Sequence, residues 1–378
     1  MRPLKITIAG AGIGGLAAAI ALARDGHSVR VSERTRGLGQ VGAGIQISPN
    51  GMAVLGALGL DEAFRAETVR LEAVRLRDGP SGREVATLDF GLHAGDLCWQ
   101  LSHRATLVAR LANAARSAGA AIELGCDCMP PPAGQALEGE DLLIGADGIR
   151  SRMRARVDGA SSPFFTRQVA WRTVIPDAGG EPVVEVHMGP GRHLVTYPIE
   201  GGRRNIAAFE ERTEWVDEGW THQDDPDNLR AAFAGFGPEV RRLLESVGHA
   251  HLWGLFRHRV ARRWVQGRKV LLGDAAHPTL PFLAQGANLA LEDAWVLAAA
   301  IRRHDLPEAL ERYQALRIPR ARRIVDAATS NARNYHLRVP PVRLVAHAAL
   351  KAASAIAPVA MLKRFDWIYR HDVTSLDV

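Results

Sequence analysis

The first forty residues combine two short apolar runs with one amphipathic stretch. The run LKITIAG, Leu4 to Gly10, predicts a buried strand, and Gly26 marks the expected end of the helix that follows it. Apolar residues recur along that helix at the spacing of a single face: Leu16, Ala19, Ile20 and Ala23. A second run, SVRVSE, ends at Glu33. This order predicts a strand–helix–strand unit, which is the building block of a parallel sheet.

The same alternation of predicted strands and helices returns twice further along the chain. Residues 104–117 predict a helix, and the short strand AIELG follows it. A connection rich in proline and glycine, residues 129–140, predicts a loop. The run DLLIGADG then predicts a buried strand that is closed by Asp147 and Gly148. From Val270, the run VLLGDAAHP predicts another apolar strand, and long helices are expected to fill the rest of the chain.

Residues 162–264 interrupt that strand–helix pattern, because their apolar and polar positions alternate as in β-strands. The alternation is strongest in four runs: QVAWRTVIP, PVVEVHMG, RHLVTYPI and RRNIAAFE. A helical, acidic stretch follows these runs. We therefore expect an α/β protein in which a β-sheet layer is inserted between two parts of a strand–helix architecture.

The composition excludes several classes of protein. With 378 residues, 47% hydrophobic and 23% charged, the chain can form two domains or one large α/β domain with insertions. The formal charge of +6 comes almost entirely from arginine, because the lysines are only Lys5, Lys269, Lys351 and Lys363. The basic residues are scattered and aromatic residues make up only 6%, so no nucleic-acid partner is expected.

The cysteines and the N-terminus bear on the cellular location. No C-x-x-C pair occurs among the three cysteines, which are Cys98, Cys126 and Cys128. We therefore expect neither a disulfide framework nor a zinc or other metal site. The chain begins directly with a predicted strand and shows no signal peptide, so a reducing cytoplasm is the expected location.

One segment near the C-terminus is apolar enough to suggest a membrane. It is LVAHAALKAASAIAPVAML, residues 344–362. His347, Lys351 and Pro358 interrupt it and alanine dominates it, which argues against a spanning helix. We expect a helix packed on the main body and no stable membrane insertion.

The first strand–helix turn, GAGIGG, carries three glycines with different expected roles. Gly10 permits the tight turn, Gly12 lets a phosphate approach the backbone closely, and Gly15 lets the helix pack on the strand. Glu33 lies 18 residues beyond Gly15, at a strand end where a carboxylate can bind the two hydroxyls of a ribose. Together these features predict a binding site for an adenine dinucleotide.

A second polar feature lies at the end of the strand that starts at Val270. Gly273 and Asp274 close that strand, and a helix is expected to begin at Gly286 after a loop of proline and small residues. The N-terminus of a helix offers free backbone N–H groups and a partial positive charge. The arrangement predicts a large, polar and partly anionic ligand at this place.

Three motifs stand in the order and spacing of one enzyme family: GAGIGG, GADGIRSRMR and LLGDAAHP. The chain resembles the class A flavoprotein monooxygenases, which are single-component aromatic hydroxylases related to salicylate and hydroxybenzoate hydroxylases. The segment VGAGIQISPNG, residues 41–51, resembles the second glycine-rich segment of that family. FDWIYRHDV near the C-terminus resembles the salicylate-hydroxylase-like branch. The resemblance covers nearly the whole chain.

The resemblance implies a Rossmann-like FAD-binding domain, an inserted β-sheet substrate domain and C-terminal helices. The expected FAD-binding domain comprises residues 1–75, 100–160 and 262–320. The expected substrate domain comprises residues 76–99 and 161–261, and the C-terminal helices comprise residues 321–378. In such an enzyme FAD is the cofactor, NADH or NADPH the reductant and O2 the co-substrate. A hydroperoxide of the flavin then hydroxylates a small aromatic substrate, here expected to be a phenolic acid.

The family's cofactor contacts imply roles for several residues. Asp274 would accept hydrogen bonds from the ribityl chain, and Arg104 would reach the phosphates. The helix that begins near Gly286 would face the N1/C2=O edge of the flavin. Asp147 would shape the FAD site and receive NAD(P)H. The full expected set is Gly10, Gly12, Gly15, Glu33, Arg34, Gly44, Arg104, Cys128, Asp147, Asp274, Gly286, Ala287 and Asn288. Cys128 would hold the adenine through its backbone, although the family has extra strands where this chain has only the proline-rich connection.

The chemistry of hydroxylation implies further residues. A ring hydroxyl must lose its proton to make the ring carbon nucleophilic, so a base must lie near the phenol. His193 and Tyr197 share one face of the predicted strand RHLVTYPI, as in some phenolic-acid hydroxylases of the family. They are expected to act as the base and as its orienting hydrogen-bond partner. Arg172 is expected to bind a substrate carboxylate, and Pro281 lies in the loop that passes the flavin's reacting face.

Three alternative functions stay open at this stage. A flavin halogenase would carry the motif W-x-W-x-I-P, whereas this chain has WRTVIP from Trp171. A ubiquinone-pathway hydroxylase is favoured only by the apolar segment near the C-terminus. A flavin-binding protein without turnover would consume no NAD(P)H. Either a monomer or a homodimer is expected.

Overall fold

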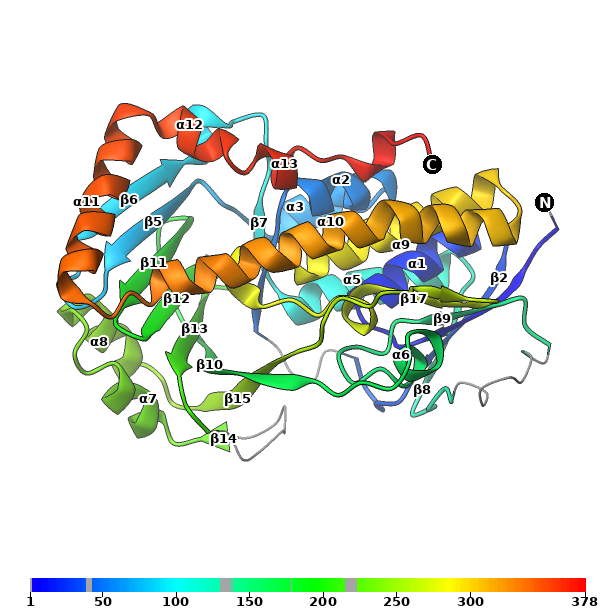
Figure 1. Ribbon diagram of the computed structural model, residues 1–378, viewed down its shortest axis with the longest axis horizontal. Coiled ribbons are helices and arrows are strands. Elements are labelled where there is room, and N and C mark those ends of the chain that lie inside the picture. Colours follow the sequence, from blue (N-terminus) through cyan, green and yellow to red (C-terminus); the bar gives the residue numbers. More distant parts are fainter. Residues whose placement is uncertain (1, 39–42, 130–136, 138, 178, 215–222) are drawn as a thin grey trace.

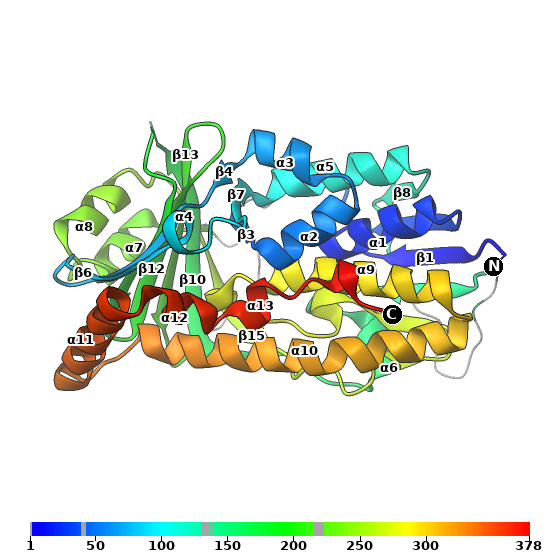
Figure 2. The same cartoon turned by 90° about the horizontal axis from the view of Figure 1, so that it is seen from above.

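The computed structural model describes residues 2–38, 43–129, 137, 139–177, 179–214 and 223–378. Part of the second glycine-rich segment and most of the proline-rich connection therefore lie outside the described residues. The molecule is elongated, with a parallel sheet towards one end and a larger, mainly antiparallel sheet towards the other (Figures 1 and 2).

The parallel sheet brings together three separate parts of the chain. Its order is β16-β17-β9-β1-β2-β8, and neighbouring strands are parallel except for the β16–β17 pair. The strands are β1 (Lys5–Ala9), β2 (Ser28–Glu33), β8 (Ala121–Leu124), β9 (Leu142–Gly145), β16 (Val265–Gln266) and β17 (Lys269–Leu271). The predicted α/β class is confirmed, and each strand predicted for this part of the chain is present.

Helices that pack against one another flank this sheet. α1 (Ile13–Arg24) contacts α5 (Arg104–Ser117) and α9 (Gly286–Arg303), and α6 (Arg152–Val157) lies beside β17. Alanine-rich sequence lets α1 be buried almost all round, since every residue from Ile13 to Leu22 is buried. The chain turns after α1 at Gly26, which has a φ of 85° that glycine adopts without strain.

The larger sheet has eight strands in the order β14-β15-β10-β13-β12-β11-β5-β6. They are β5 (Ala73–Asp78), β6 (Glu84–Asp89), β10 (Phe164–Pro176), β11 (Val183–Gly189), β12 (Arg192–Ile199), β13 (Arg203–Glu211), β14 (Gln223–Asp224) and β15 (Ala250–Arg257). α7 (Pro226–Ala232) and α8 (Pro238–Glu245) cover one face, where Trp171 and Phe233 form part of a hydrophobic core. The opposite face carries Arg172 and Tyr197, which line the cavity described below.

A small sheet joins the two larger ones. It consists of β3 (Gly44–Ile47), β7 (Gln100–His103) and β4 (Val69–Arg70) in the order β3-β7-β4. The neighbouring helices are α2 (Pro49–Ala57), α3 (Asp61–Glu67) and α4 (Phe90–His93). The short 3-10 turns η1 (Gly273–Ala275) and η2 (Pro281–Leu283) connect β17 to α9.

The C-terminal fifth of the chain is helical. It contains α10 (Leu306–Tyr335), α11 (Pro340–Ile356), α12 (Pro358–Lys363), α13 (Asp366–Tyr369) and the 3-10 turn η3 (Val373–Ser375). α10 runs along the length of the molecule and contacts α9 and η2 (Figures 1 and 2). This helix therefore connects the parallel sheet with the far end of the larger sheet.

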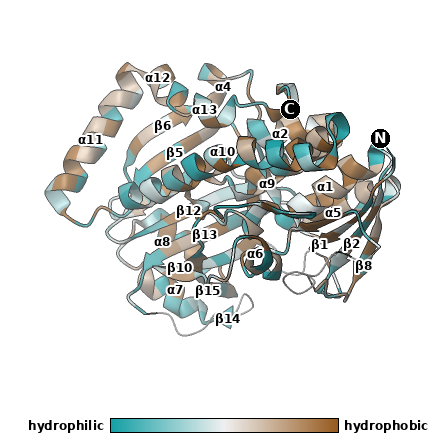
Figure 3. Ribbon diagram, turned by 45° about the vertical axis from the view of Figure 1, so that its right-hand side comes forward, coloured by the Kyte–Doolittle hydropathy of each residue, from teal (hydrophilic) through white to brown (hydrophobic). Residues whose placement is uncertain are grey.

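The apolar segment at residues 344–362 forms two helices instead of the single packed helix that was expected. α11 ends at Ile356 and α12 begins at Pro358, because proline suits the first turn of a helix better than its interior. α11 lies at one end of the molecule (Figure 3) and packs on β6. Its residues Val345 and Ile356 are 70% and 83% exposed. In the described part of the chain, no helix is long and apolar enough to cross a membrane.

A buried ionic cluster fastens α9 to α10. Glu292 and Asp293 of α9 are inaccessible to solvent, and Arg317 of α10 lies within 2.7 Å of both carboxylates. Burial alone would raise the pKa of Asp293, but His277 and Arg317 outweigh it and lower the pKa to about 2. Both acids are therefore charged, and Arg320 adds a 2.6 Å contact to Glu292.

Replacing Arg317 with methionine should destabilise the protein strongly, because it leaves two buried carboxylates without their shared partner. Breaking such a buried pair costs about 3–5 kcal/mol. We expect the Tm to fall by roughly 5 °C in a thermal melt, because the unfolding entropy of a 378-residue chain is large. Arg312→Met is the matched control, since Arg312 pairs with Glu308 on the exposed side of the same helix and should change stability by less than about 1 kcal/mol. Equal melting temperatures for the two variants would show that the cluster contributes little.

Candidate active site

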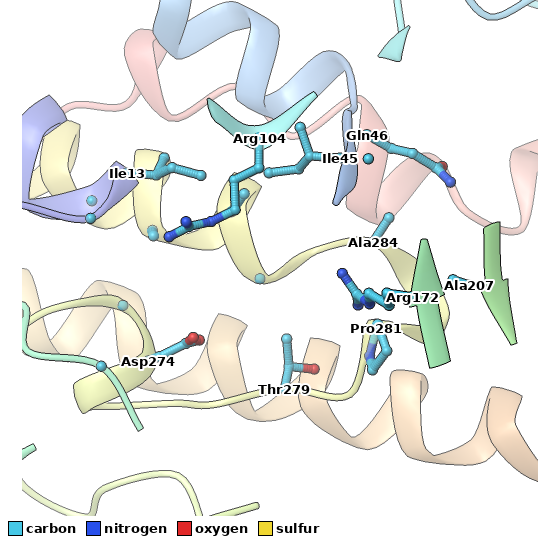
Figure 4. Close-up of a pocket in the computed structure, with 18 of the residues that line it drawn as sticks. Ile13, Ile45, Gln46, Arg104, Arg172, Ala207, Asp274, Thr279, Pro281 and Ala284 are labelled. Atoms are coloured by element: carbon cyan, nitrogen blue, oxygen red, sulfur yellow. The ribbon is translucent and has the colours of Figure 1, made fainter. Parts of the chain in front are cut away.

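A cavity of about 360 Å³ lies between the carboxyl ends of the parallel strands and the face of the larger sheet that is opposite α7 and α8. Its walls come from segments that are far apart in the sequence, as Figure 4 shows for ten labelled residues. Ligands of open parallel sheets bind at this edge, where strands end and helices begin. The cavity is therefore the place to look for the predicted dinucleotide site.

The glycine-rich turn has the geometry predicted for it. Gly10 has a φ of 106°, and a Cβ there would lie 2.4 Å from the carbonyl oxygen of Ala146. A Cβ on Gly15 would lie 2.1 Å from the carbonyl oxygen of Gly10, so only glycine lets the helix approach this closely. Glu33 holds the turn in place, because its Oε2 accepts a hydrogen bond of 2.9 Å from the backbone N–H of Ala11. Gly12 and Gly15 line the cavity, whereas Gly10 and Glu33 lie just behind it.

Gly12 is open on its side-chain side. A Cβ built there would meet no protein atom within 4 Å, and its φ of −77° is one that alanine adopts freely. Gly12→Ala should therefore fold normally but block the close approach of a phosphate. We expect the FAD affinity to fall by about tenfold or more, since losing a hydrogen bond to a charged group costs about 1.5–3 kcal/mol. Titration of apoprotein with FAD measures this.

Gly248→Ala is the matched control for that experiment. Gly248 also has no neighbour within 4 Å of a Cβ, but it lies in a loop away from the cavity. Its replacement should leave FAD binding unchanged. If Gly12→Ala binds FAD as tightly as the wild type, the pyrophosphate does not lie against this turn.

Arg104 and Asp274 face each other across the end of the cavity nearest the glycine turn (Figure 4). Both side chains are open to the cavity, although protein atoms surround them. Burial raises the pKa of the Asp274 carboxyl, while His277 and Arg104 act in the opposite direction. Burial lowers the pKa of Arg104, while Asp274 and Glu33 oppose the change. The pair presents a donor and an acceptor to the same ligand, which fits a phosphate and a hydroxylated chain.

The N-terminus of α9 points at the cavity. Gly286 and Ala287 line it, and no side chain caps the helix. Free N–H groups therefore remain for a ligand that carries negative charge. Asn288 does not line the cavity, because its side chain accepts from the N–H of Ser48 at 3.0 Å and donates to the carbonyl of Gln46 at 3.2 Å. Asn288 thus fastens α9 to the small sheet.

Three other expected cofactor residues lie outside the cavity lining. The Oδ2 of Asp147 accepts hydrogen bonds from the N–H groups of Arg152 at 2.8 Å and Met153 at 3.2 Å. Its Oδ1 is buried and has no hydrogen-bond partner within the described chain. Arg34 is exposed after β2. Cys128 is half-buried, and burial raises the pKa of its thiol to about 11.

Arg172 enters the other end of the cavity from β10, near Pro281 and Ala284 (Figure 4). Its guanidinium lies over the ring of Trp253, 5.4 Å from the centroid. Burial lowers the pKa of Arg172, and the charge of Arg104 acts in the same direction. No carboxylate in the described residues pairs with Arg172. Arginine stays charged even when buried, so this group needs an anion.

Tyr197 lines the cavity from β12, and Gly44 lies against it. Burial raises the pKa of the Tyr197 phenol, while Arg172 and a hydrogen bond with Gln46 oppose this. The phenol is therefore neutral and can donate. Gly44 has little spare space, since a Cβ would come within 2.8 Å of the Tyr197 ring. Its N–H donates to the Oδ1 of Asn205 at 2.7 Å, which joins the small sheet to the larger one.

His193 shares the strand face of Tyr197 but does not line the cavity. Its ring is inaccessible to solvent and stacks on Phe209, with centroids 4.5 Å apart. Phe282 meets it edge-on at 5.2 Å. The structure therefore brings Tyr197, Arg172 and Pro281 to the cavity wall and places His193 at the edge, behind Phe209.

Several wall residues were not anticipated from the sequence. They are Gln46, Val195, Asn205, Ala207, Phe209 and Thr279. Strand alternation could have found the β12 and β13 members, because they follow a period of two on the face that carries Tyr197. In the described part of the chain, no group of histidine, cysteine and acidic residues is arranged to hold a metal ion.

Comparison with known proteins decides the family. Residues 4–129 and 137–328 match the family described as FAD binding domain. The chain belongs to the FAD-binding domain family. It is 37% identical to a 3-amino-4-hydroxybenzoate 2-monooxygenase of Streptomyces cremeus, over 89% of each chain. It is 31% identical to a 3-hydroxybenzoate 6-hydroxylase of Polaromonas naphthalenivorans, over 98% of this chain and 96% of the relative.

The solved structures agree with this family. The FAD complex of a Klebsiella pneumoniae HpxO variant superposes with a TM-score of 0.83 at 25% identity, covering 96% of this chain and 98% of that one. The predicted class, a single-component FAD-dependent aromatic monooxygenase, is confirmed. The open Gly12, the uncapped start of α9 and the facing pair Arg104–Asp274 all fit FAD.

Proposed function

We propose that this FAD-dependent aromatic monooxygenase hydroxylates a phenolic carboxylic acid of the hydroxybenzoate type. The observation that carries the proposal is Arg172, a charged side chain that faces the cavity without a carboxylate partner in the described chain. A substrate carboxylate would supply the missing anion through a bidentate pair. The names of the two relatives, a hydroxylase and a monooxygenase of substituted benzoates, support the same substrate class.

The sheet provides a floor for an aromatic ring between Arg172 and His193. Arg172 pairs with Ala207 and Ala207 with Val195 across three adjacent strands, and His193 lies two residues along from Val195. With strands about 4.8 Å apart and residues about 3.4 Å apart along a strand, the two Cα atoms are roughly 12 Å apart. The short side chains of Ala207 and Val195 leave room for an aromatic ring between Arg172 and His193. A ring with a carboxylate at Arg172 can then direct a hydroxyl towards His193.

Each residue has a distinct role in this proposal. Arg172 binds the carboxylate, and the neutral phenol of Tyr197 orients the substrate hydroxyl by a hydrogen bond. His193 takes the hydroxyl proton as general base, which requires the substrate to reach its buried Nε2 past the packed rings of Phe209 and Phe282. Pro281 borders the space in which the ring meets the flavin.

FAD would be held by the glycine turn, Arg104, Asp274 and the N-terminus of α9. Bound FAD supplies the electrons taken from NAD(P)H and the activated oxygen. The residues around the cavity exclude water and position the acid. This favours transfer of oxygen to the substrate over its release as hydrogen peroxide. NAD(P)H would approach transiently near Asp147, since the sequence holds one complete dinucleotide fingerprint and FAD uses it. A cytoplasmic monomer or homodimer completes the proposal.

Oxidation of NADH and NADPH by the purified holoenzyme tests this function. The rate should rise sharply when 3-hydroxybenzoate, 4-hydroxybenzoate or an amino-substituted hydroxybenzoate is added, and a hydroxylated acid should form. The corresponding phenols without a carboxylate should stimulate far less. Equal stimulation by acids and by neutral phenols would contradict the role given to Arg172, and no stimulation by any of them would contradict the substrate class.

A further inference from the structure

A row of three side chains leads from the edge of the cavity to the surface. The Nδ1 of His193 lies 2.6 Å from the Nε2 of His336, and the Nδ1 of His336 lies 2.9 Å from the Oε1 of Glu211. His193 is inaccessible and His336 is 4% exposed, whereas the Glu211 side chain is 32% exposed. The three residues come from β12, the end of α10 and β13. They form a continuous hydrogen-bonded path from the interior to solvent.

The charge of Glu211 sets the direction of these hydrogen bonds. Burial raises the pKa of Glu211, but hydrogen bonds from Arg338 and His336 outweigh it and lower the pKa. Glu211 is therefore a carboxylate near neutral pH and can only accept, so His336 donates from Nδ1. Burial lowers the pKa of His336, which keeps it neutral, and its Nε2 is then an acceptor for the Nδ1–H of His193.

This order leaves the Nε2 of His193 without a proton. Burial lowers the pKa of His193 well below its usual value, so the ring is neutral. The Nε2 is buried and has no hydrogen-bond partner in the described residues. A buried nitrogen with a free lone pair calls for a ligand, because leaving it unsatisfied is costly. His193 adjoins Val195 and Phe209, which both line the cavity, so we assign a substrate bound there as the ligand of this nitrogen.

Few other titratable groups face the path. The ring of Tyr335 lies 5.1 Å from His193, and burial raises the pKa of Tyr335 to about 12, so it is neutral. The positive charges of Arg338 and Arg192 lower the pKa of His336. Arg338 also pairs with Glu211, and Arg192 pairs with Glu210 on the other face of β13. These charges keep His336 neutral, and Arg338 keeps Glu211 ionised, so a proton that reaches Glu211 passes readily to water.

We propose that His336 and Glu211 carry to solvent the proton that His193 takes from the substrate hydroxyl. The O–H bond breaks and its proton joins the Nε2 of His193, while the Nδ1 proton of His193 moves to the Nε2 of His336. The Nδ1 proton of His336 moves to Glu211, which releases it to water. Both rings stay neutral, and the same path run backwards reprotonates the product. No oxidant or reductant takes part in this transfer.

The inference rests on the proposed function, since it assigns the exit path for that reaction's proton. Neither His336 nor Glu211 lines the cavity, so both act through His193 and are positioning residues. A path of this kind lets a fully buried base work repeatedly without water entering the cavity. Through this relay, the partly exposed carboxylate of Glu211 controls the rate at which the buried substrate loses its proton.

Proton release on substrate binding tests the relay. Oxidised holoenzyme is mixed with 3-hydroxybenzoate or 4-hydroxybenzoate in weakly buffered solution at pH 7, and an indicator dye records the released proton. Glu211→Gln and His336→Gln keep hydrogen-bonding side chains but cannot pass a proton on. We expect release to slow by about tenfold or more, with FAD content and substrate Kd unchanged. Turnover of both variants should rise as the pH approaches about 10, where the phenolate binds directly.

Glu210→Gln is the matched control, since Glu210 is the neighbouring acid and points to the other face of β13. It should release the proton at the wild-type rate. Glu211→Asp should recover part of the loss, because it restores a carboxylate. Wild-type rates and pH profiles in both Glu211→Gln and His336→Gln would overturn the relay alone. A wild-type holoenzyme that no hydroxybenzoate stimulates would overturn the proposed function, and the relay with it.

Discussion

Replacing His193 with alanine should leave FAD bound and NAD(P)H oxidised while product formation falls by about 100-fold or more. The ring lies at the cavity edge behind Phe209, and its Nε2 is free to take a proton. Without this base the substrate hydroxyl keeps its proton and the ring carbon stays a poor nucleophile. Oxygen activated at the flavin should then leave as hydrogen peroxide. The ratio of product to NAD(P)H consumed measures the effect.

Tyr197→Phe is the companion variant for that experiment. It removes one hydrogen bond and keeps the ring that lines the cavity, so the loss of coupling should be milder. A structural role for His193 would instead lower FAD content or stability, which the visible spectrum and a thermal melt would reveal. If His193→Ala remains fully coupled on the true substrate, the base lies elsewhere and this strand is only a wall.

Replacing Arg172 with methionine should weaken the binding of the acid substrate by about 100-fold. A bidentate pair provides two hydrogen bonds to a charged group, and each contributes about 1.5–3 kcal/mol. A loss of about 3 kcal/mol corresponds to roughly 100-fold in Kd. Methionine keeps an unbranched side chain beside Trp253 while it removes the guanidinium and its charge. Changes in the flavin spectrum on titration with the acid measure this affinity.

The Arg172 experiment has two controls, one that changes the ligand and one that changes the protein. The amide of the same hydroxybenzoic acid carries no negative charge, so Arg172→Met should bind it about as well as the wild type does. Arg172→Lys should recover part of the affinity for the acid, because it keeps a charge but loses the planar fork. An equal loss of affinity for the acid and the amide would mean that Arg172 shapes the cavity and does not bind the carboxylate.

The cofactor site could be predicted from the sequence because local rules decide it. A turn that needs a positive φ at Gly10 and a helix that must approach the carbonyl of Gly10 at Gly15 each require glycine. The strand β17, which ends shortly before Asp274, and the helix that starts at Gly286 are likewise local patterns. For α5, the predicted bounds of residues 104–117 coincide with the observed helix.

Long-range pairings decided what the sequence could not reveal. Strand alternation put His193 and Tyr197 on one face, but only the packing of β13 and η2 determines that Phe209 and Phe282 cover His193. Its contact with His336 joins residues 143 positions apart. The prediction for Asn288 concerned the backbone at the start of α9, and the sequence did not reveal that its side chain bonds to the segment after β3.

Mass spectrometry of the product formed under 18O2 tests the central claim most directly. The holoenzyme is supplied with NADH or NADPH and with hydroxybenzoates in ordinary water. The account predicts an acid that carries one new hydroxyl group, with one atom of 18O from the gas and none from water. It also predicts that the amount of labelled product falls by about 100-fold or more in His193→Ala, which makes peroxide instead. Consumption of NAD(P)H without labelled product, for every phenolic acid supplied, would contradict the account.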